Sequence, residues 1–186
     1  MKTKIISGIF ACLLVAGVAL LSVVSAGGAR GAYKLEGAWV ARVVENPVRW
    51  SAVFAPDASG RRATGHAQFD VGPVIPDLGF GVATKDSHIF VELEMTGRDS
   101  AAFMGVWYGI KEPSTIFPGV VSGDIVYIGV DKGEVTFETP DRMLGVHTIE
   151  YYVPSQDADG DGFPDPGQAP VYSTEITSVN TRHPGP

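Results

Sequence analysis

Cysteine is almost absent from this sequence. The 186 residues contain one, Cys12, which falls within the apolar run near the N-terminus. A chain that begins after that run therefore has no disulfide, no thiol nucleophile and no cysteine-based zinc or iron–sulfur site. An exported domain of this size does without disulfides if its hydrophobic core is large enough.

Basic residues are also scarce. The formal net charge is −7, because 14 lysines and arginines stand against 21 aspartates and glutamates. Lys2 and Lys4 precede the apolar run, so the remainder of the chain is more acidic still. This charge makes nucleic acids and anionic membrane surfaces unfavourable partners, and it favours metal cations or basic surfaces.

The N-terminus has the pattern of a secretory signal peptide. A short basic segment precedes an apolar run over Ile5–Val24, and the small residues Ser25 and Ala26 follow. We therefore predict a signal peptide over 1–26, a flexible linker over 27–34 and one β domain over 35–183. The protein is then exported to the periplasm, the cell surface or the medium. An uncleaved anchor is the alternative, because about 20 apolar residues span a bilayer.

Helical periodicity is the third absence. Gly (23 residues) and Pro (13 residues) interrupt nearly every window, while β-branched and aromatic residues occur in short runs. This pattern predicts short strands separated by turns. The expected strands are 35–44, 48–55, 62–70, 87–96, 101–110, 120–130, 134–139, 145–153 and 171–181. We expect Asp131-Lys132-Gly133 to form a hairpin turn.

Alternation also predicts which side chains face the core. In segment 87–96 one face is apolar and the other is mostly polar, which is typical of a half-solvated antiparallel strand. The apolar face carries Ile89, Val91, Leu93 and Met95, and the opposite face carries His88, Phe90, Glu92 and Glu94. In segment 35–44, Trp39 shares its face with Leu35, Ala41 and Val43.

These strands predict an all-β fold, an antiparallel up-and-down barrel of about eight or nine strands. Closing the sheet removes the exposed edges that a secreted protein must otherwise protect. A barrel of about eight strands is filled by side chains or holds one small ligand. A two-sheet β-sandwich is the alternative, because segment 101–110 is apolar on both faces. We expect a monomer.

The triplet Gly37-Ala38-Trp39 resembles the Gly-x-Trp signature of lipocalins and the wider calycin group. The resemblance implies that Trp39 packs at the closed end of the barrel beneath an arginine near the end of the last strand, where Arg182 stands. The sequence shows no second lipocalin motif and no C-terminal helix. The whole chain after residue 26 also resembles small exported bacterial β proteins, and this resemblance implies no activity.

The most specific chemistry lies in Asp157-Ala158-Asp159-Gly160-Asp161-Gly162-Phe163-Pro164-Asp165. Aspartates at alternate positions and a glycine at position 6 suit a hard divalent cation. The segment resembles calcium loops of thrombospondin type 3 repeats and, more loosely, of EF-hands. That resemblance implies side-chain ligands from Asp157, Asp159, Asp161 and Asp165, and the carbonyl of Phe163.

Position 12 departs from both families, because Gln168 replaces the carboxylate there. We therefore predict structural Ca²⁺ of weak affinity, with a Kd on the order of 10⁻⁴–10⁻³ M. The alternative is a solvated acidic loop whose Asp-Gly pairs only turn the chain.

The predicted turns also place this loop in the barrel. Successive connections of a meander alternate between its two ends. With a turn at 131–133, the aspartate loop lies at the same end as the turns at 56–61 and 97–100. The long apolar loop 71–86, and a ligand mouth, then lie at the opposite end. A separate strand at Thr115–Val121 would reverse this placement.

Two classes of function fit the sequence. The first is a non-enzymatic exported binding module with a calcium-stiffened loop, which holds an apolar small molecule or docks a surface partner. The second is a barrel enzyme, an isomerase or hydrolase, that uses His66, His88 and Glu92 in the barrel mouth. The outward direction of His88 and Glu92, and the absence of a nucleophile-elbow or zincin motif, disfavour the enzyme. A purely structural surface domain is a third reading.

Overall fold

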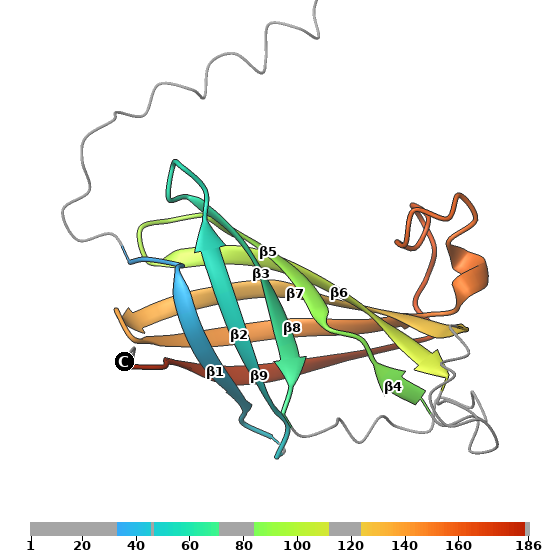
Figure 1. Ribbon diagram of the computed structural model, residues 1–186, viewed down its shortest axis with the longest axis horizontal. Coiled ribbons are helices and arrows are strands. Elements are labelled where there is room, and N and C mark those ends of the chain that lie inside the picture. Colours follow the sequence, from blue (N-terminus) through green and yellow to red (C-terminus); the bar gives the residue numbers. More distant parts are fainter. Residues whose placement is uncertain (1–32, 46, 71–83, 112–123, 185–186) are drawn as a thin grey trace, which may run out of the picture. The chain divides into compact units, whose positions relative to one another are not determined.

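The computed structural model describes residues 33–45, 47–70, 84–111 and 124–184. Within these ranges the chain forms strands and one short 3-10 turn (Figure 1). The elements are β1 (Gly37–Val43), β2 (Arg49–Pro56), β3 (Arg62–Phe69), β4 (Thr84–Asp86), β5 (Ile89–Met95), β6 (Ser100–Lys111), β7 (Ile125–Thr139), β8 (Arg142–Tyr152), η1 (Pro154–Gln156) and β9 (Tyr172–Arg182).

The strands close into an eight-stranded antiparallel barrel. The order β6-β5-β3-β2-β1-β9-β8-β7 is completed by pairing of β6 with β7. The short strand β4 pairs with the end of β6, next to β5 along that strand. The predicted up-and-down barrel is therefore confirmed, and the sandwich alternative is wrong. Strand β6 is apolar on both faces because part of its outer face is also covered, as described below.

The predicted hairpin at 131–133 is wrong. Strand β7 runs without a break through these residues and pairs on both sides. Its Asp131 lies opposite Gly105 of β6, and its Gly133 lies opposite His147 of β8. Gly133 serves close packing, because a Cβ there would lie 2.0 Å from the carbonyl oxygen of Val146. The segments 120–130 and 134–139, expected as separate strands, thus contribute to one strand over Ile125–Thr139.

Losing this turn reverses the predicted placement of the aspartate loop. The connection from β8 to β9 leaves the barrel at the end where β3 and β6 finish. This connection lies on the right-hand side of Figure 1. The sequence predicted that the loop shares an end with the turns at 57–61 and 96–99, but these turns lie at the opposite end of the barrel. Residues 71–83 of the long apolar loop and the segment 115–121 lie outside the described residues. Of that long loop, Thr84–Asp86 form β4.

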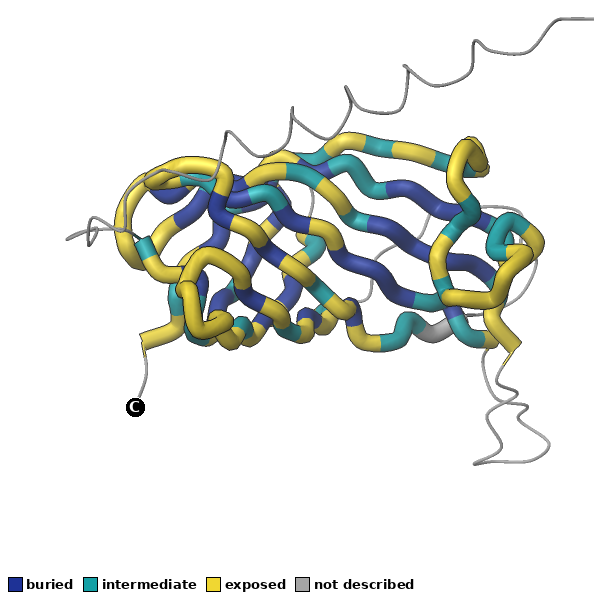
Figure 2. Tube along the Cα trace, turned by 90° about the horizontal axis from the view of Figure 1, so that it is seen from above, coloured by how far each residue is buried: buried dark blue, intermediate teal, exposed yellow. Residues whose placement is uncertain are grey.

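The barrel interior holds two stacked groups of apolar side chains. One group includes Leu35, Trp39, Leu93, Phe103 and Phe137, and the other includes Trp50, Ile89, Trp107, Tyr127 and Tyr151. Buried and exposed residues alternate along most strands (Figure 2). The predicted faces of segments 35–44 and 87–96 are confirmed, since Trp39, Leu93 and Met95 are buried whereas Glu92 and Glu94 are exposed.

The predicted signal peptide and most of the linker lie outside the described residues. Among the residues that are described, no helix is long and apolar enough to cross a membrane.

Candidate functional site

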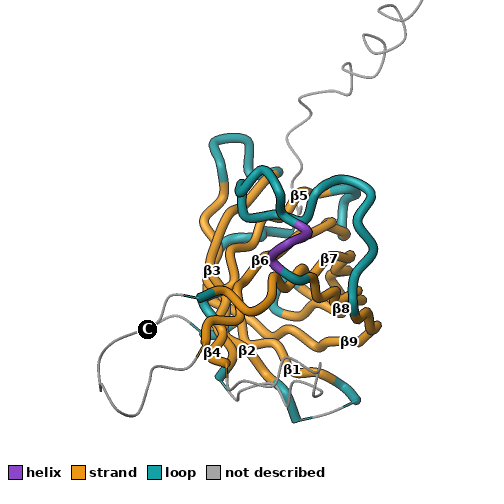
Figure 3. Tube along the Cα trace, turned by 90° about the vertical axis from the view of Figure 1, so that its right-hand side faces the viewer, coloured by secondary structure: helices purple, strands orange, loops and turns teal. Residues whose placement is uncertain are grey.

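The aspartate loop folds back over the outside of the barrel. It begins with η1, which contacts β7 (Figure 3). The hydroxyl of Tyr108 on β6 donates a hydrogen bond to the Gly162 carbonyl at 3.1 Å. Four residues of the outer wall are buried in this region, namely Val106, Ile128, Val130 and Tyr152. The loop therefore covers an apolar patch that the barrel alone would expose to water.

Side chain to backbone hydrogen bonds shape the turn of the loop. The carboxylate of Asp157 accepts from the amides of Asp161 at 3.1 Å and Gly162 at 3.0 Å. Gly160 and Gly162 have φ of 73° and 91°, a region that residues with a Cβ rarely adopt. The Asp-Gly pairs thus fold the chain tightly enough to bring distant aspartates together.

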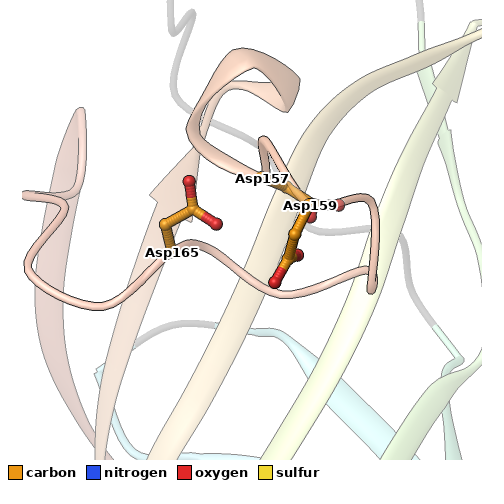
Figure 4. Close-up of side chains that lie close together, drawn as sticks. All are labelled: Asp157, Asp159 and Asp165. Carbon is orange, nitrogen blue, oxygen red and sulfur yellow. The ribbon is translucent and has the colours of Figure 1, made fainter.

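Three carboxylates of the loop converge. One oxygen each from Asp157, Asp159 and Asp165 lies within 4.8 Å of the others (Figure 4). Asp161 does not belong to this group, and its Oδ1 accepts from the Phe163 amide at 2.8 Å. Of the four aspartates predicted as ligands, the structure therefore brings three together and leaves the fourth as a turn residue.

Glutamines brace the base of the loop. Gln156 Oε1 accepts from the Val153 amide at 2.9 Å, and its Nε2 donates to the Ala169 carbonyl at 2.8 Å. The same Nε2 lies 3.5 Å from Oε1 of Gln168. Gln168, at position 12 of the loop, therefore faces Gln156. It does not belong to the group of converging carboxylates.

The electrostatic effect of the loop reaches the barrel wall. Burial raises the pKa of Tyr108, and the carboxylates of Asp157 and Asp161 raise it further. Next to the covered patch, Glu150 Oε2 accepts from Lys132 Nζ and from the Tyr152 hydroxyl, both at 2.8 Å. Burial raises the pKa of Glu150, but these hydrogen bonds outweigh burial, so that its pKa lies below the usual value.

The barrel interior contains a polar chain that sequence reasoning missed. His147 Nδ1 lies 3.0 Å from the carboxylate of Asp131, and Nε2 lies 2.7 Å from Ser178 Oγ. Asn180 Nδ2 donates to the same Oγ at 2.8 Å. Strands β7, β8 and β9 each place inward-facing residues at this level. Gly145 permits the approach, because a Cβ there would lie 2.6 Å from both His147 Nε2 and Ser178 Oγ.

The order Asp131–His147–Ser178 is that of a serine-hydrolase triad, but its surroundings do not suit catalysis. Ser178 is 0% exposed, so a substrate carbonyl has no access to its Oγ. Its oxygen also already accepts the Asn180 amide. We conclude that the chain is a satisfied buried network that orients the histidine ring. The sequence did contain a signal for this network. If the inward and outward alternation of residues 125–130 is extended by one residue, Asp131 faces the interior of the barrel.

The residues considered for an enzyme lie outside the barrel. His66, His88 and Glu92 are all exposed. His66 and Glu92 line an outer groove of about 530 Å³, together with Val53, Phe90, Met104 and Phe163. The structure therefore brings two of the three to one surface, but none of them faces the interior.

At the end of the barrel opposite the aspartate loop, the segment before β1 meets the end of β9. Trp39 is 2% exposed, and the guanidinium carbon of Arg182 lies 4.4 Å from the centroid of its ring. Arg182 also donates to the carbonyls of Lys34 and Glu36. Gly37 has a φ of 112°, and a Cβ there would lie 2.6 Å from Arg182 Nη1. The Gly-x-Trp triplet thus has a steric basis in this chain.

These features define the molecule as a closed eight-stranded up-and-down barrel with a carboxylate-bearing loop on its wall. No protein-family model matches the chain, and no curated protein matches it.

Proposed function

We propose that this protein is an exported, non-enzymatic binding module. In this proposal the aspartate loop binds Ca²⁺ weakly, and the barrel holds a small, largely apolar molecule. The observation that carries the calcium part is the convergence of the carboxylates of Asp157, Asp159 and Asp165 within 4.8 Å. Three like charges at this separation repel one another unless a cation lies among them.

The donor chemistry favours calcium among divalent cations. Ca²⁺ takes 6–8 oxygen ligands in a flexible geometry, and carboxylates, carbonyls and water all serve. Asp161 and the Phe163 carbonyl, which lie on the same turn, are candidates for the remaining positions. Mg²⁺ suits the loop less well, because it needs near-octahedral geometry and keeps several waters. With neutral Gln168 at position 12, a Kd on the order of 10⁻⁴–10⁻³ M is expected.

The proposed role of the ion is to hold the loop against the barrel wall. The loop covers Val106, Ile128, Val130 and Tyr152, and Phe163 at its tip borders the outer groove. A cation that neutralises the loop would therefore stabilise the covered patch and also position Phe163. That groove exposes the apolar side chains of Val53, Phe90 and Met104, so it is a candidate docking surface for a protein partner. Because Phe163 borders the groove, the binding of such a partner would depend on calcium.

The apolar-ligand part is supported by the barrel itself and by its closed end. The Trp39–Arg182 arrangement is what the lipocalin resemblance implied, and we propose a distant calycin kinship on that ground. Changes in tryptophan fluorescence on addition of small apolar molecules test this part, since Trp50 lines an interior cavity.

A calcium titration tests the loop. At Ca²⁺ about tenfold above the Kd, linkage predicts about 1.4 kcal/mol of stabilisation, which raises Tm by about 3–6 °C. Asp159→Asn and Asp165→Asn should abolish the shift. Asp99→Asn is the matched control, because it removes the same charge from an exposed turn at the other end of the barrel.

Proteolysis gives a second measurement. Calcium should slow cleavage between Val153 and Val171 in the parent protein and not in Asp159→Asn. The calcium part is abandoned if millimolar Ca²⁺ changes neither Tm nor this cleavage rate. Export is tested separately, since N-terminal sequencing of the secreted protein should begin at Gly27.

A further inference from the structure

The middle of the barrel contains a cavity of about 50 Å³. Most of its wall is apolar or aromatic, with Trp50, Phe54 and Phe103 among the lining residues. Asp131, His147 and Asn180 provide the polar part of the lining. A cavity needs at least about 10–15 Å³ of this volume to hold one water, so the space suits an occupant of only a few non-hydrogen atoms.

One assignment of donors satisfies all of the buried hydrogen bonds around His147. The ring donates from Nδ1 to Asp131, the Ser178 hydroxyl donates to Nε2, and the Asn180 amide donates to Ser178 Oγ. This assignment follows from the network, in which each donor is used once. The Asp131 side chain is 17% exposed and lines the cavity.

Inside the barrel, the basic side chain that Asp131 meets is His147, and none of the described lysines and arginines lines the cavity. Every lysine and arginine whose side chain the structure describes is exposed, except Arg182. Arg182 binds backbone carbonyls at the closed end of the barrel. Removing most of a carboxylate from water is costly, and a ligand that brings a full positive charge to Asp131 would reduce that cost.

The aromatic wall also favours a cation. The rings of Trp50 and Phe103 lie 5.4 and 4.7 Å from that of His147, so they surround the polar group. Aromatic faces attract ammonium groups electrostatically, and tryptophan does so most strongly. An ammonium at Asp131 would therefore have a carboxylate partner and an aromatic surround, while a short alkyl chain would fill the apolar side.

We infer that the barrel interior binds a small protonated aliphatic amine, whose ammonium donates to Asp131. The inference rests on the proposed binding of a small molecule inside the barrel, and it names the chemical class of that molecule. An anion would be repelled by Asp131. A neutral molecule of the same size would bring no charge to pair with the carboxylate.

Three ligands of similar size test the inference on the unmodified protein. Propylammonium, 1-propanol and propionate are titrated at neutral pH and constant ionic strength, while the Trp50 indole and Asn180 amide resonances are followed by NMR. Propylammonium should bind in the millimolar range, with a Kd at least tenfold lower than that of either other ligand. This comparison needs no variant, so a variant that fails to fold does not prevent the test.

Two variants sharpen the comparison. Asp131→Asn should raise the Kd for propylammonium at least tenfold, because the acceptor remains and the charge is lost. Glu134→Gln is the control, since it removes a charge from an exposed position on the same strand, and it should leave the Kd unchanged.

The alternative outcomes separate this inference from the proposed function. If 1-propanol binds as tightly as propylammonium, or Asp131→Asn binds the amine as well as the parent does, the inferred class is wrong and the interior small-molecule site stands. If none of the three ligands shifts the Trp50 resonance, both are wrong. The calcium proposal is unaffected by either result.

Discussion

Arg182 lies over Trp39, with 4.4 Å between its guanidinium carbon and the ring centroid, and so joins the last strand of the barrel to the first. These two strands pair directly, with Trp39 opposite Arg182. The guanidinium also pairs with Asp141 at 3.1 Å. One side chain thus ties the segment before β1, the turn between β7 and β8, and the end of β9 together.

Arg182→Ala should lower the free energy of unfolding by about 3 kcal/mol, because several charged hydrogen bonds to the backbone and a cation–π contact are lost. Arg182→Lys should recover less than half, since an ammonium cannot reproduce the planar fork. Urea unfolding measures both. Arg62→Ala is the control, because its pair with Glu94 is exposed and should contribute below about 1 kcal/mol. Equal losses from both arginines would contradict the assignment.

Tyr108→Phe should loosen the aspartate loop without unfolding the barrel. It removes the hydrogen bond to the Gly162 carbonyl, which contributes about 1 kcal/mol. Cleavage within 153–171 should therefore accelerate about fivefold if local opening limits it. Tyr33→Phe, at the opposite end of the barrel, provides the control. A cleavage rate unchanged in Tyr108→Phe would mean that the loop is held by other contacts.

Glu150 should make stability depend on pH in the acid range. Its pKa in the folded protein lies below the usual 4.5, so the unfolded chain takes up the proton first as pH falls. Its contribution is then fully present above about pH 4.5 and is lost as pH falls through the lower folded-state value.

Glu150→Gln tests this sign. At neutral pH it should lower the free energy of unfolding by about 1 kcal/mol, because the hydrogen bond from Lys132 loses its charged acceptor. The difference from the parent should shrink as pH falls below 4.5, measured by urea unfolding across pH. A difference that grows in acid would contradict the assigned direction. Glu92→Gln, at an exposed position, is the control.

Gly133→Ala tests the continuity of β7. A Cβ at this position would lie 2.0 Å from the Val146 carbonyl oxygen, so the paired strands must separate, at a cost of about 3 kcal/mol. Glu134→Ala, at the exposed neighbouring position, should cost less than about 1 kcal/mol. Both are measured by thermal or urea unfolding. A tolerated Gly133→Ala would indicate a loose turn, as the sequence alone suggested.

Alternation predicted the strands and their faces because each inward side chain is selected for the same apolar interior. Trp39, Leu93 and Met95 are buried as predicted, and the strands around them differ from prediction by a few residues at their ends. Turn chemistry was less reliable. Asp131 and Gly133 look like turn residues, yet the aspartate serves a buried histidine and the glycine serves close strand packing.

That one misassigned turn had a large effect on the predicted site. It added a connection that does not exist, and so placed the aspartate loop at the wrong end of the barrel. It also hid the Asp131–His147–Ser178 chain, since Asp131 was not expected inside. The spacing of Asp157, Asp159 and Asp165 did predict their grouping, because a short loop with two positive-φ glycines brings such positions together locally.

The sequence by itself determined the all-β class, the faces of most strands and the carboxylate-rich loop, because all three depend on spacing within a few residues. Only the tertiary structure decided which end of the barrel carries that loop, that it covers the outer wall, and that a single carboxylate lies beside an interior cavity. These depend on pairings between strands far apart in the chain. Their register follows from packing around the whole barrel, which local patterns do not encode.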